Sequence, residues 1–387
     1  MIRALPGRSA PPLVLTAGLA ALAAACGDNL AGPDGPVADA APPEVRAVIA
    51  AGTFMQGQAG VLSALELDPL RVSRRVASSG AVGSDPVLRR AGRELFVVNR
   101  TENNVTILDA ATFAVKEQLA TGAGSNPQDV AAFGDELFVP ALASAGVIVL
   151  TRGSGARQVI DLSALDPDGQ PNCVSAYAVG GAIYVACGLL DPMFVPHGPG
   201  QIAVIDAATH AVTTTFPLEN KNPFGLFEQL PAQLSDNAFG GDLVIPTVPS
   251  FSDLSTGCVE RVQTGAAPKA AGCVVSNQAL GGFAARLDVQ VQGSLLLWLV
   301  VSWYDAAPRG NLQGFDLLTQ KLWPAPVSPP SQLLVDLAVC PNNLVVVADQ
   351  TMAANGLRVY DDLIEQTTAA MAIGLRPGSS HGLACYQ

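Results

Sequence analysis

The sequence has few charged residues and few histidines, and both shortages narrow the range of functions. Charged residues make up 14% of the 387 positions, and 21 basic residues stand against 33 acidic ones, a formal net charge of −12. Nucleic acids and anionic lipid surfaces attract clustered positive charge, so we do not expect them as partners. Of the three histidines, His197 and His210 have no second ligand at metal spacing. We interpret both as loop residues.

Two familiar catalytic patterns are also missing. No C-x-x-C occurs in the sequence, which excludes a thioredoxin-like redox site, a zinc knuckle and a haem-attachment motif. Residues 378–382 fit the spacing G-x-S-x-G, but a nucleophile elbow requires a strand, a turn and a helix, with acid and histidine partners downstream. Only five residues follow the motif, so we assign no catalytic nucleophile.

The N-terminal apolar run is too short to cross a membrane as a helix. It extends from Leu13 to Ala25, about 13 residues, whereas a spanning helix needs about 20. Arg3 and Arg8 precede the run, and small residues lead into Cys26. This order of a basic region, an apolar region and a small-residue cleavage site predicts a secretory signal over residues 1–25.

The residues around Cys26 predict a lipid anchor. Ala23-Ala24-Ala25-Cys26 resembles the lipobox of bacterial lipoproteins, although Leu22 stands one place earlier than the usual leucine. The resemblance implies a diacylated Cys26, a membrane contact through lipid, and an outer-membrane lipoprotein facing the periplasm or the cell surface. Residues 26–44, rich in Ala, Gly, Pro and Asp, are expected to form a flexible tether. The alternative is ordinary cleavage and release into the periplasm.

The other cysteines predict disulfides. Besides Cys26 there are six, an even number in an oxidising compartment, so we expect three bonds among Cys173, Cys187, Cys258, Cys273, Cys340 and Cys385. Six cysteines permit 15 pairings. Cys173 and Cys187 flank a Gly180-Gly181 hairpin at nearly opposed positions, which favours their pairing, while the other two bonds stay open.

A repeated pair of strands sets the expected fold over residues 45–387. Glu94–Asn99 is an apolar run followed by a polar turn and a second run that ends at Asp109, and Ala182–Asp206 repeats the arrangement. Repeats of roughly 45 residues with four short strands are typical of β-propeller blades. Seven second strands are expected, beginning near Val45, Glu94, Glu136, Ala182, Asp242, Leu295 and Asn343.

We therefore predict an all-β, seven-bladed β-propeller whose C-terminal strand, within residues 380–386, closes the first blade. Borrowing this strand removes two exposed edges and joins the two ends of the ring. Aspartates at the ends of the third strands are expected to fix the following turn through backbone N–H groups two residues on. These aspartates are Asp109, Asp206, Asp316 and Asp361.

The segment Leu95–Thr112 resembles the YVTN-type repeat of surface-layer-like bacterial β-propellers. The resemblance covers about residues 45–387, is strong in this blade and poor between Asp236 and Trp323. It implies an extracytoplasmic scaffold or binding protein, and a related propeller group includes lactone hydrolases. Fold is implied more firmly than function.

One candidate site lies where the first strands of the blades begin. Aligning these strands places polar residues at one position in six blades, and Val87 breaks the ring in blade two, where Asp85 lies close by. The polar residues are Asp129, Ser175, Ser235, Asp288, Asp336 and His381. Asp129, Asp288, Asp336 and His381 form a candidate site for a divalent cation, Ca²⁺ or Mg²⁺, at the channel mouth. The alternative is that such residues bond backbone and channel water.

Two functions follow from these observations. The first is an envelope-anchored propeller that acts as a protein or glycan binding module or scaffold and is not an enzyme. Its contacts would be made by the propeller faces or by the Pro-rich loops 189–200 and 246–256. The second is a metal-dependent, lactonase-like hydrolase with its site in the channel. A cofactor-binding dehydrogenase has little support, because Trp298, Trp303 and Trp323 gather in one blade.

Overall fold

The computed structural model describes residues 45–232, 234, 239–250, 253–291, 295–303, 308–378 and 381–387. These residues belong to the unit Pro43–Gln387. The predicted signal over 1–25, the tether 26–44 with Cys26, and Ser235 lie outside the described ranges. Within those ranges, neither length nor apolar content of any helix suffices to cross a membrane.

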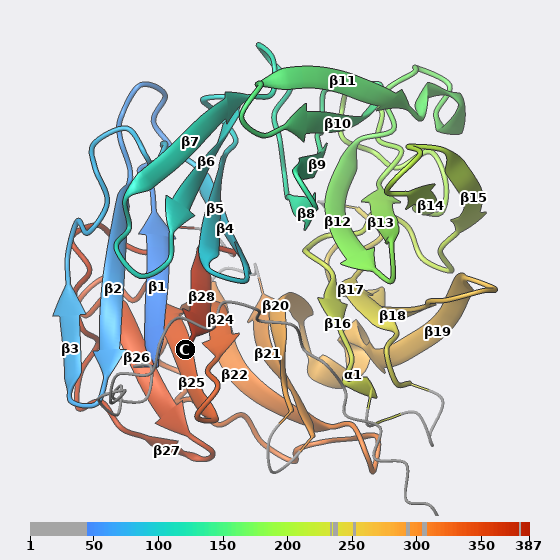
Figure 1. The fold of residues 1–387 in the computed structure, drawn as a ribbon. Helices are drawn as coiled ribbons and strands as arrows, with labels where there is room; N and C mark the ends of the chain where they lie inside the picture. The colour runs from blue at the N-terminus through green and yellow to red at the C-terminus, as the bar shows by residue number, and fades with distance from the viewer. Residues whose placement is uncertain are drawn as a thin grey trace, which may run out of the picture. The chain divides into compact units, whose positions relative to one another are not determined.

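The fold is a seven-bladed β-propeller, as predicted, with seven antiparallel sheets of four strands arranged around a central channel (Figure 1). Blades one and two contain β28 (Leu383–Tyr386), β1 (Arg46–Ala51), β2 (Val61–Leu67), β3 (Leu70–Ser73), β4 (Pro86–Ala91), β5 (Glu94–Asn99), β6 (Asn104–Asp109) and β7 (Val115–Ala120). Blades three and four contain β8 (Ala131–Phe133), β9 (Glu136–Pro140), β10 (Gly146–Thr151), β11 (Ala156–Asp161), β12 (Cys173–Val179), β13 (Ala182–Cys187), β14 (Gln201–Asp206) and β15 (Val212–Pro217).

The remaining blades follow the same order, from the channel outward. Blades five to seven contain β16 (Glu228–Gln229), β17 (Leu243–Pro246), β18 (Cys258–Gln263), β19 (Lys269–Ser276), β20 (Phe283–Gln290), β21 (Leu296–Trp303), β22 (Arg309–Asp316), β23 (Lys321–Leu322), β24 (Leu334–Val339), β25 (Leu344–Asp349), β26 (Gly356–Asp361) and β27 (Ile364–Glu365). The described helices are the short η1 (Ser163–Leu165) and α1 (Asn277–Leu280). All seven predicted second strands begin within one residue of their expected positions.

The second strands are continuously apolar because both of their faces are buried. In β5, Leu95 and Val97 pack with Leu62 of blade one, whereas Phe96 and Val98 pack with Val139 of blade three. Successive side chains of a strand point to opposite faces, so a blade held between two neighbours needs apolar residues at every position. The core of the molecule therefore lies between the blades.

The C-terminal strand closes the ring as expected. β28 pairs with β1 from Arg46 opposite Tyr386 to Ile49 opposite Leu383. The disulfide Cys340–Cys385 links this strand to the end of β24, and the Tyr386 hydroxyl donates to the carbonyl of Ala110 in blade two at 2.7 Å. Blade one is therefore attached to both of its neighbours through its four-residue C-terminal strand.

The three expected disulfides are present. Cys173–Cys187 joins β12 to β13 at directly opposed residues, as the hairpin suggested. Cys258–Cys273 joins β18 to β19, and Cys340–Cys385 joins blade seven to blade one. Two of the bonds therefore hold neighbouring strands of one blade together, and the third connects two blades.

The turn aspartates act through their backbone bonds. Asp109 accepts from the N–H groups of Ala111 and Thr112, and Asp206 accepts from those of Ala208 and Thr209. Asp316 accepts in the same way from Leu318 and Thr319. The structural role predicted for these three residues is confirmed.

Blade five differs from the expectation. We aligned its first strand with residues 235–239, but the strand that pairs with β17 is β16, Glu228–Gln229. Two residues are too few to show a strand period in the sequence. The segment is placed by two buried residues, Leu226, which packs in the core between blades two and three, and Phe227, which packs in the core between blades four and five.

Candidate functional site

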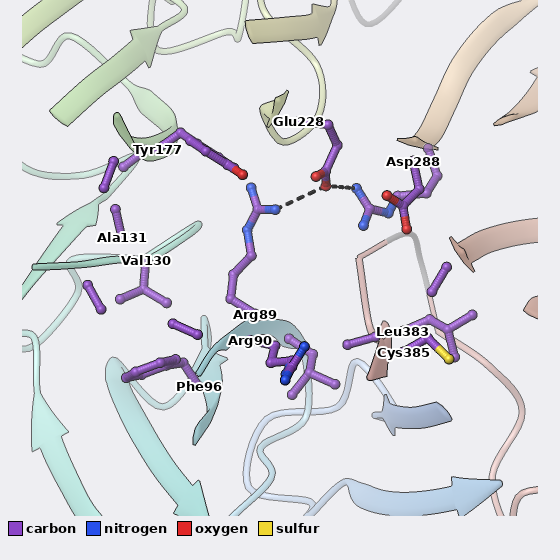
Figure 2. A pocket seen from close by; sticks show the side chains of 18 residues that line it. Arg89, Arg90, Phe96, Val130, Ala131, Tyr177, Glu228, Asp288, Leu383 and Cys385 are labelled. Carbon is purple, nitrogen blue, oxygen red and sulfur yellow. Dashed lines mark hydrogen bonds and ion pairs between the residues drawn. The ribbon is translucent and has the colours of Figure 1, made fainter. Parts of the chain in front are cut away.

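The first strands of all seven blades surround a pocket of about 310 Å³ in the central channel. We call it the channel pocket, and Figure 2 shows its lining. Small apolar residues make up much of the wall, among them Ala131, Ala176 and Ala338. The polar and charged side chains of the lining are Arg89, Arg90, Tyr177, Glu228, Arg286 and Asp288.

A row of five alternating charges crosses the channel. Oε1 of Glu228 accepts from Nη1 of Arg89 at 3.1 Å and from Nη1 of Arg286 at 2.8 Å (Figure 2). Arg89 forms a two-pronged ion pair with Asp129, through bonds of 2.7 and 3.0 Å. Nε of Arg286 lies 3.3 Å from Oδ1 of Asp336. This ion-pair row of Asp129, Arg89, Glu228, Arg286 and Asp336 joins five blades.

The register of the inner strands explains which residues face one another. Ser175 pairs with Ala186 and Asp336 with Ala348, and in each strand the pairing register shifts just before that residue. In blade six the residue after the equivalent shift is Arg286, and Asp288 lies two positions further along. Asp288 is therefore out of register with the predicted ring, because the hairpin of blade six is longer. Arg286 and its partner Val300 are 14 positions apart, whereas Ser175 and Ala186 are 11 apart and Asp336 and Ala348 are 12 apart. His381 likewise precedes β28 instead of lying within it.

Two of the predicted metal ligands are fully engaged in holding blades together. Asp129 accepts from Arg89, from the Ser175 hydroxyl at 2.7 Å and from the Ala176 N–H at 3.1 Å. Asp336 accepts from the N–H groups of Gly382 at 2.6 Å and Leu383 at 2.9 Å.

The four predicted ligands do not converge on one point. Over the described ranges, no three His, Cys, Asp or Glu side chains form a group that could hold a metal ion. The bonds of Asp129 and Asp336 fit the alternative role in backbone bonding, and these residues do not fit a Ca²⁺ or Mg²⁺ site.

Burial in the channel changes the proton affinity of its carboxylates. Burial and the neighbouring Glu228 raise the pKa of Asp288 to about 7, against the attraction of Arg286. Burial also raises the pKa of Asp336 to about 6. Burial opposes the charge of Arg89, but Asp129 and Glu228 hold its pKa above the ordinary value. The channel pocket thus combines permanent cations with one half-buried carboxyl that titrates near neutrality.

A second pocket, of about 230 Å³, lies at the end of the channel where the inner strands begin. We call it the mouth pocket. Gln128, Val174 and Leu226 line it. Each of them lies two residues before a residue that lines the channel pocket, so the two pockets follow one another along the channel. Arg100, Asn222 and His381 supply further polar side chains. Burial, together with the charges of Arg286 and Arg100, lowers the pKa of His381 well below its ordinary value, so its imidazole is neutral.

The other predicted features have structural partners. His197 lies 3.0 Å from Asp166, and His210 lies 2.7 Å from Glu136. Met193 and Phe194 of the loop 189–200 are 80% and 54% exposed, so this part of the loop faces solvent and does not fold into the channel. Phe251 lies outside the described residues.

Sequence reasoning missed Arg89, Glu228 and Arg286. A signal for the arginines was present, since Arg89 and Arg286 are charged residues within short strands of mainly apolar residues. Glu228 could not be found from the alignment because the first strand of blade five was placed elsewhere.

Comparison with known proteins supports the fold. No family model and no curated protein matches the sequence. A protein provisionally assigned as a 6-phosphogluconolactonase from Bacteroides uniformis superposes with a TM-score of 0.62 at 13% identity, over 89% of this chain and 100% of that one. The dihydro-heme d1 dehydrogenase NirN gives 0.53 at 16% identity, over 92% and 77%. AztD from Citrobacter koseri gives 0.52 at 12%, over 88% and 98%.

A lactonase and a dehydrogenase have different activities, and identities of this size establish the architecture alone. The YVTN-type repeat stays a resemblance of the sequence. The chain shares its β-propeller fold with AztD, NirN and a lactonase-like protein.

Proposed function

We propose that this chain is an exported, lipid-anchored propeller of the bacterial cell envelope that binds a glycan in its channel pocket. The N-terminal pattern of Arg3, Arg8, the apolar run and Cys26 supports export and anchoring. The protein then displays a rigid ring outside the cytoplasm, and binding needs no catalytic group.

The observation that carries the proposal is the set of fixed donors and acceptors around Glu228. Arg89 and Arg286 hold the Glu228 carboxylate from both sides, so these side chains keep their positions without a ligand. Such preorganisation reduces the entropy lost on binding. Sugar hydroxyls both donate and accept hydrogen bonds, and they match a wall that offers guanidinium and phenol donors beside carboxylate acceptors.

Size and shape favour a glycan over a folded protein partner. The channel pocket is enclosed by seven strands, and its 310 Å³ lies at the low end of the range for small-ligand sites. A protein surface is too broad to enter it, whereas the end of a sugar chain has the right width. Tyr177 and Phe96 place apolar surface beside the polar groups of the lining. This combination fits a sugar ring, which has both apolar and polar surface.

The test is direct titration of envelope-type oligosaccharides into the purified full chain, followed by calorimetry. Tyr177→Phe and Glu228→Gln each remove hydrogen-bonding capacity at nearly constant volume, and each should weaken binding about three- to tenfold. Tyr360→Phe serves as the matched control, because the Tyr360 hydroxyl bonds Gln332 away from the channel pocket. Binding that is unchanged in both channel variants would exclude this site.

A second function is favoured by one observation, the pKa of Asp288 of about 7 in a pocket where the Arg286 guanidinium acts on this carboxyl. A carboxyl that titrates near neutrality can act as a general acid or base in ester or lactone hydrolysis. Incubation with a panel of lactones, with products followed by chromatography, separates the two functions. Turnover that disappears in Asp288→Asn would establish a hydrolase, and unchanged lactones would leave the binding protein.

A further inference from the structure

Three polar side chains of the mouth pocket carry buried atoms that have no hydrogen-bond partner within the protein. Asn222 and His381 are buried residues, whereas Arg100 is half-buried and its Nη1 lies 3.4 Å from Oδ1 of Asp85. Both amide atoms of Asn222 are unpartnered, as are Nδ1 of His381 and Nε of Arg100. Asn222 is 1% exposed and His381 is 6% exposed. Natural proteins rarely leave such groups unpaired, so a cluster of them that lines one pocket calls for an explanation.

The three side chains reach the pocket from separate parts of the chain. Arg100 follows β5, Asn222 lies between β15 and β16, and His381 lies two residues before β28. The described apolar lining includes Leu142, Leu190, Phe224 and Leu226. A few convergent polar groups within an otherwise apolar concavity are the usual composition of a small-molecule site.

The backbone at this pocket is held in uncommon conformations. His381 has a φ of 85° and Asn222 a φ of 36°. Positive φ is uncommon outside glycine, although Asn and His adopt it more readily than most residues, and it persists where the surrounding structure enforces it. The bonds that Asp336 accepts from Gly382 and Leu383 hold the chain immediately after His381.

The unpartnered atoms define the chemistry of a matching ligand. The Asn222 side chain offers one donor and one acceptor side by side, and the Arg100 Nε adds a donor. A carboxylate or an ester could accept from these donors, but it would leave the Asn222 oxygen without a hydrogen. An amide satisfies both atoms of Asn222, because its carbonyl accepts and its N–H donates.

We propose that the mouth pocket is a second binding site, which takes a small amide with an apolar body. The amide pairs with the Asn222 carboxamide and accepts from Arg100, and the apolar body packs against Phe224 and Leu190. The site is distinct from the channel pocket, and the inference does not depend on glycan binding.

Three probes of the same shape test the chemistry on the full chain. Phenylacetamide has a donor and an acceptor, methyl phenylacetate has acceptors alone, and phenylacetate is an anion. We expect calorimetry to give one site for phenylacetamide and at least about tenfold weaker binding for the other two, since each lacks a hydrogen bond that the amide makes. Equal or tighter binding of phenylacetate would overturn the proposal in favour of an organic-acid site.

Variants locate the site. Asn222→Asp keeps size and tolerance of positive φ but replaces the donor, and it should weaken phenylacetamide binding about tenfold. Asn311→Asp is the matched control, because Asn311 is a buried asparagine with an unpartnered Oδ1 that does not line this pocket. Tyr177→Phe in the channel pocket should leave phenylacetamide binding unchanged.

A second variant covers the case in which Asn222→Asp fails to fold. Leu142 is half-buried at the rim, and Leu142→Trp should block the pocket without touching its polar atoms. Binding that survives Leu142→Trp would overturn the site. So would a crystal structure with phenylacetamide in which ordered water alone bonds Asn222, His381 and Arg100.

Discussion

At the residue scale, Asp129 and Asp288 behave differently because different groups surround them. Asp129 is fully buried and is neutralised by Arg89. Asp288 is half-buried, and its oxygens accept from the backbone N–H groups of Val289 and Val339. Like-charge repulsion from Glu228 adds to burial, so Asp288 is the carboxyl whose proton is retained near neutral pH.

This raised pKa predicts how stability depends on pH. The folded protein holds the Asp288 proton up to about pH 7, whereas the unfolded chain releases it near its ordinary value of 3.8. The contribution of this carboxyl to stability is therefore complete below the unfolded pKa and is lost as the pH rises through 7. The amide of an Asp288→Asn variant stays neutral at every pH, so the Tm of the variant relative to the natural protein should increase from about pH 5 to about pH 8.

The matched control for this experiment is Asp109→Asn. Hydrogen bonds from Thr112 lower the pKa of Asp109, so that residue does not change charge over the interval. Thermal unfolding followed by circular dichroism measures all three proteins. Parallel Tm curves for Asp288→Asn and the natural protein would show that Asp288 is ionised throughout.

At the element scale, each inner strand is fastened to the next blade through a side chain. Asp129 of blade three bonds Ala176 of blade four, and Ser175 of blade four accepts from Phe227 at the start of blade five. Asp288 of blade six accepts from Val339 of blade seven. These bonds satisfy backbone N–H groups on the side of the blades that faces the channel, where no further strand is present to accept them.

The closing strand β28 should be the weak element of the ring, because it has four residues and follows the whole propeller in the chain. Replacing Cys340 and Cys385 together by serine should lower the free energy of unfolding by about 2–5 kcal/mol. Hydrogen exchange should accelerate at Arg46–Ile49, which pair with β28. Denaturant unfolding and exchange mass spectrometry measure both effects.

Replacing Cys258 and Cys273 by serine is the corresponding control. That bond spans 15 residues within blade five, whereas Cys340–Cys385 spans 45. Its loss should accelerate exchange in β18 and β19 and leave β1 protected. Unchanged exchange in β1 after removal of Cys340–Cys385 would mean that hydrogen bonds and packing alone keep the ring closed.

At the scale of the whole molecule, two pockets at successive levels share one channel, with the ion-pair row at the wall beside them. The chain is strongly acidic, with a net charge of −12. Electrostatic attraction therefore cannot keep the protein at an anionic membrane surface. We propose instead that a covalent lipid on Cys26 retains the protein at the envelope.

The anchor predicts a change in fractionation. Expressed in a Gram-negative host, the natural chain should sediment with membranes, and a Cys26→Ser variant should not, because it has no thiol to acylate. Thr16→Ser in the apolar run should behave like the natural chain. Mass spectrometry of the N-terminal peptide identifies the acyl groups. A natural chain found entirely in the soluble periplasm would instead indicate ordinary cleavage and release.

The sequence by itself determined the propeller, its seven second strands and the closing strand. Runs such as Leu95–Val98 are buried on both faces, and that burial leaves an apolar signature in the chain. It also determined the number of disulfides and the bonding of Asp109, Asp206 and Asp316, since these aspartates bond neighbours two or three residues away. Local sequence patterns predict local geometry, and their repetition from blade to blade makes them recognisable.

The tertiary structure alone decided the site. The longer hairpin of blade six placed Arg286 where the alignment had Asp288. The two-residue strand β16 brought Glu228 between arginines that are 139 and 58 residues distant in the chain. The unpartnered atoms of Asn222, His381 and Arg100 meet only because three blades converge. Such contacts join residues that are far apart in the sequence. They form only when the seven blades close into a ring.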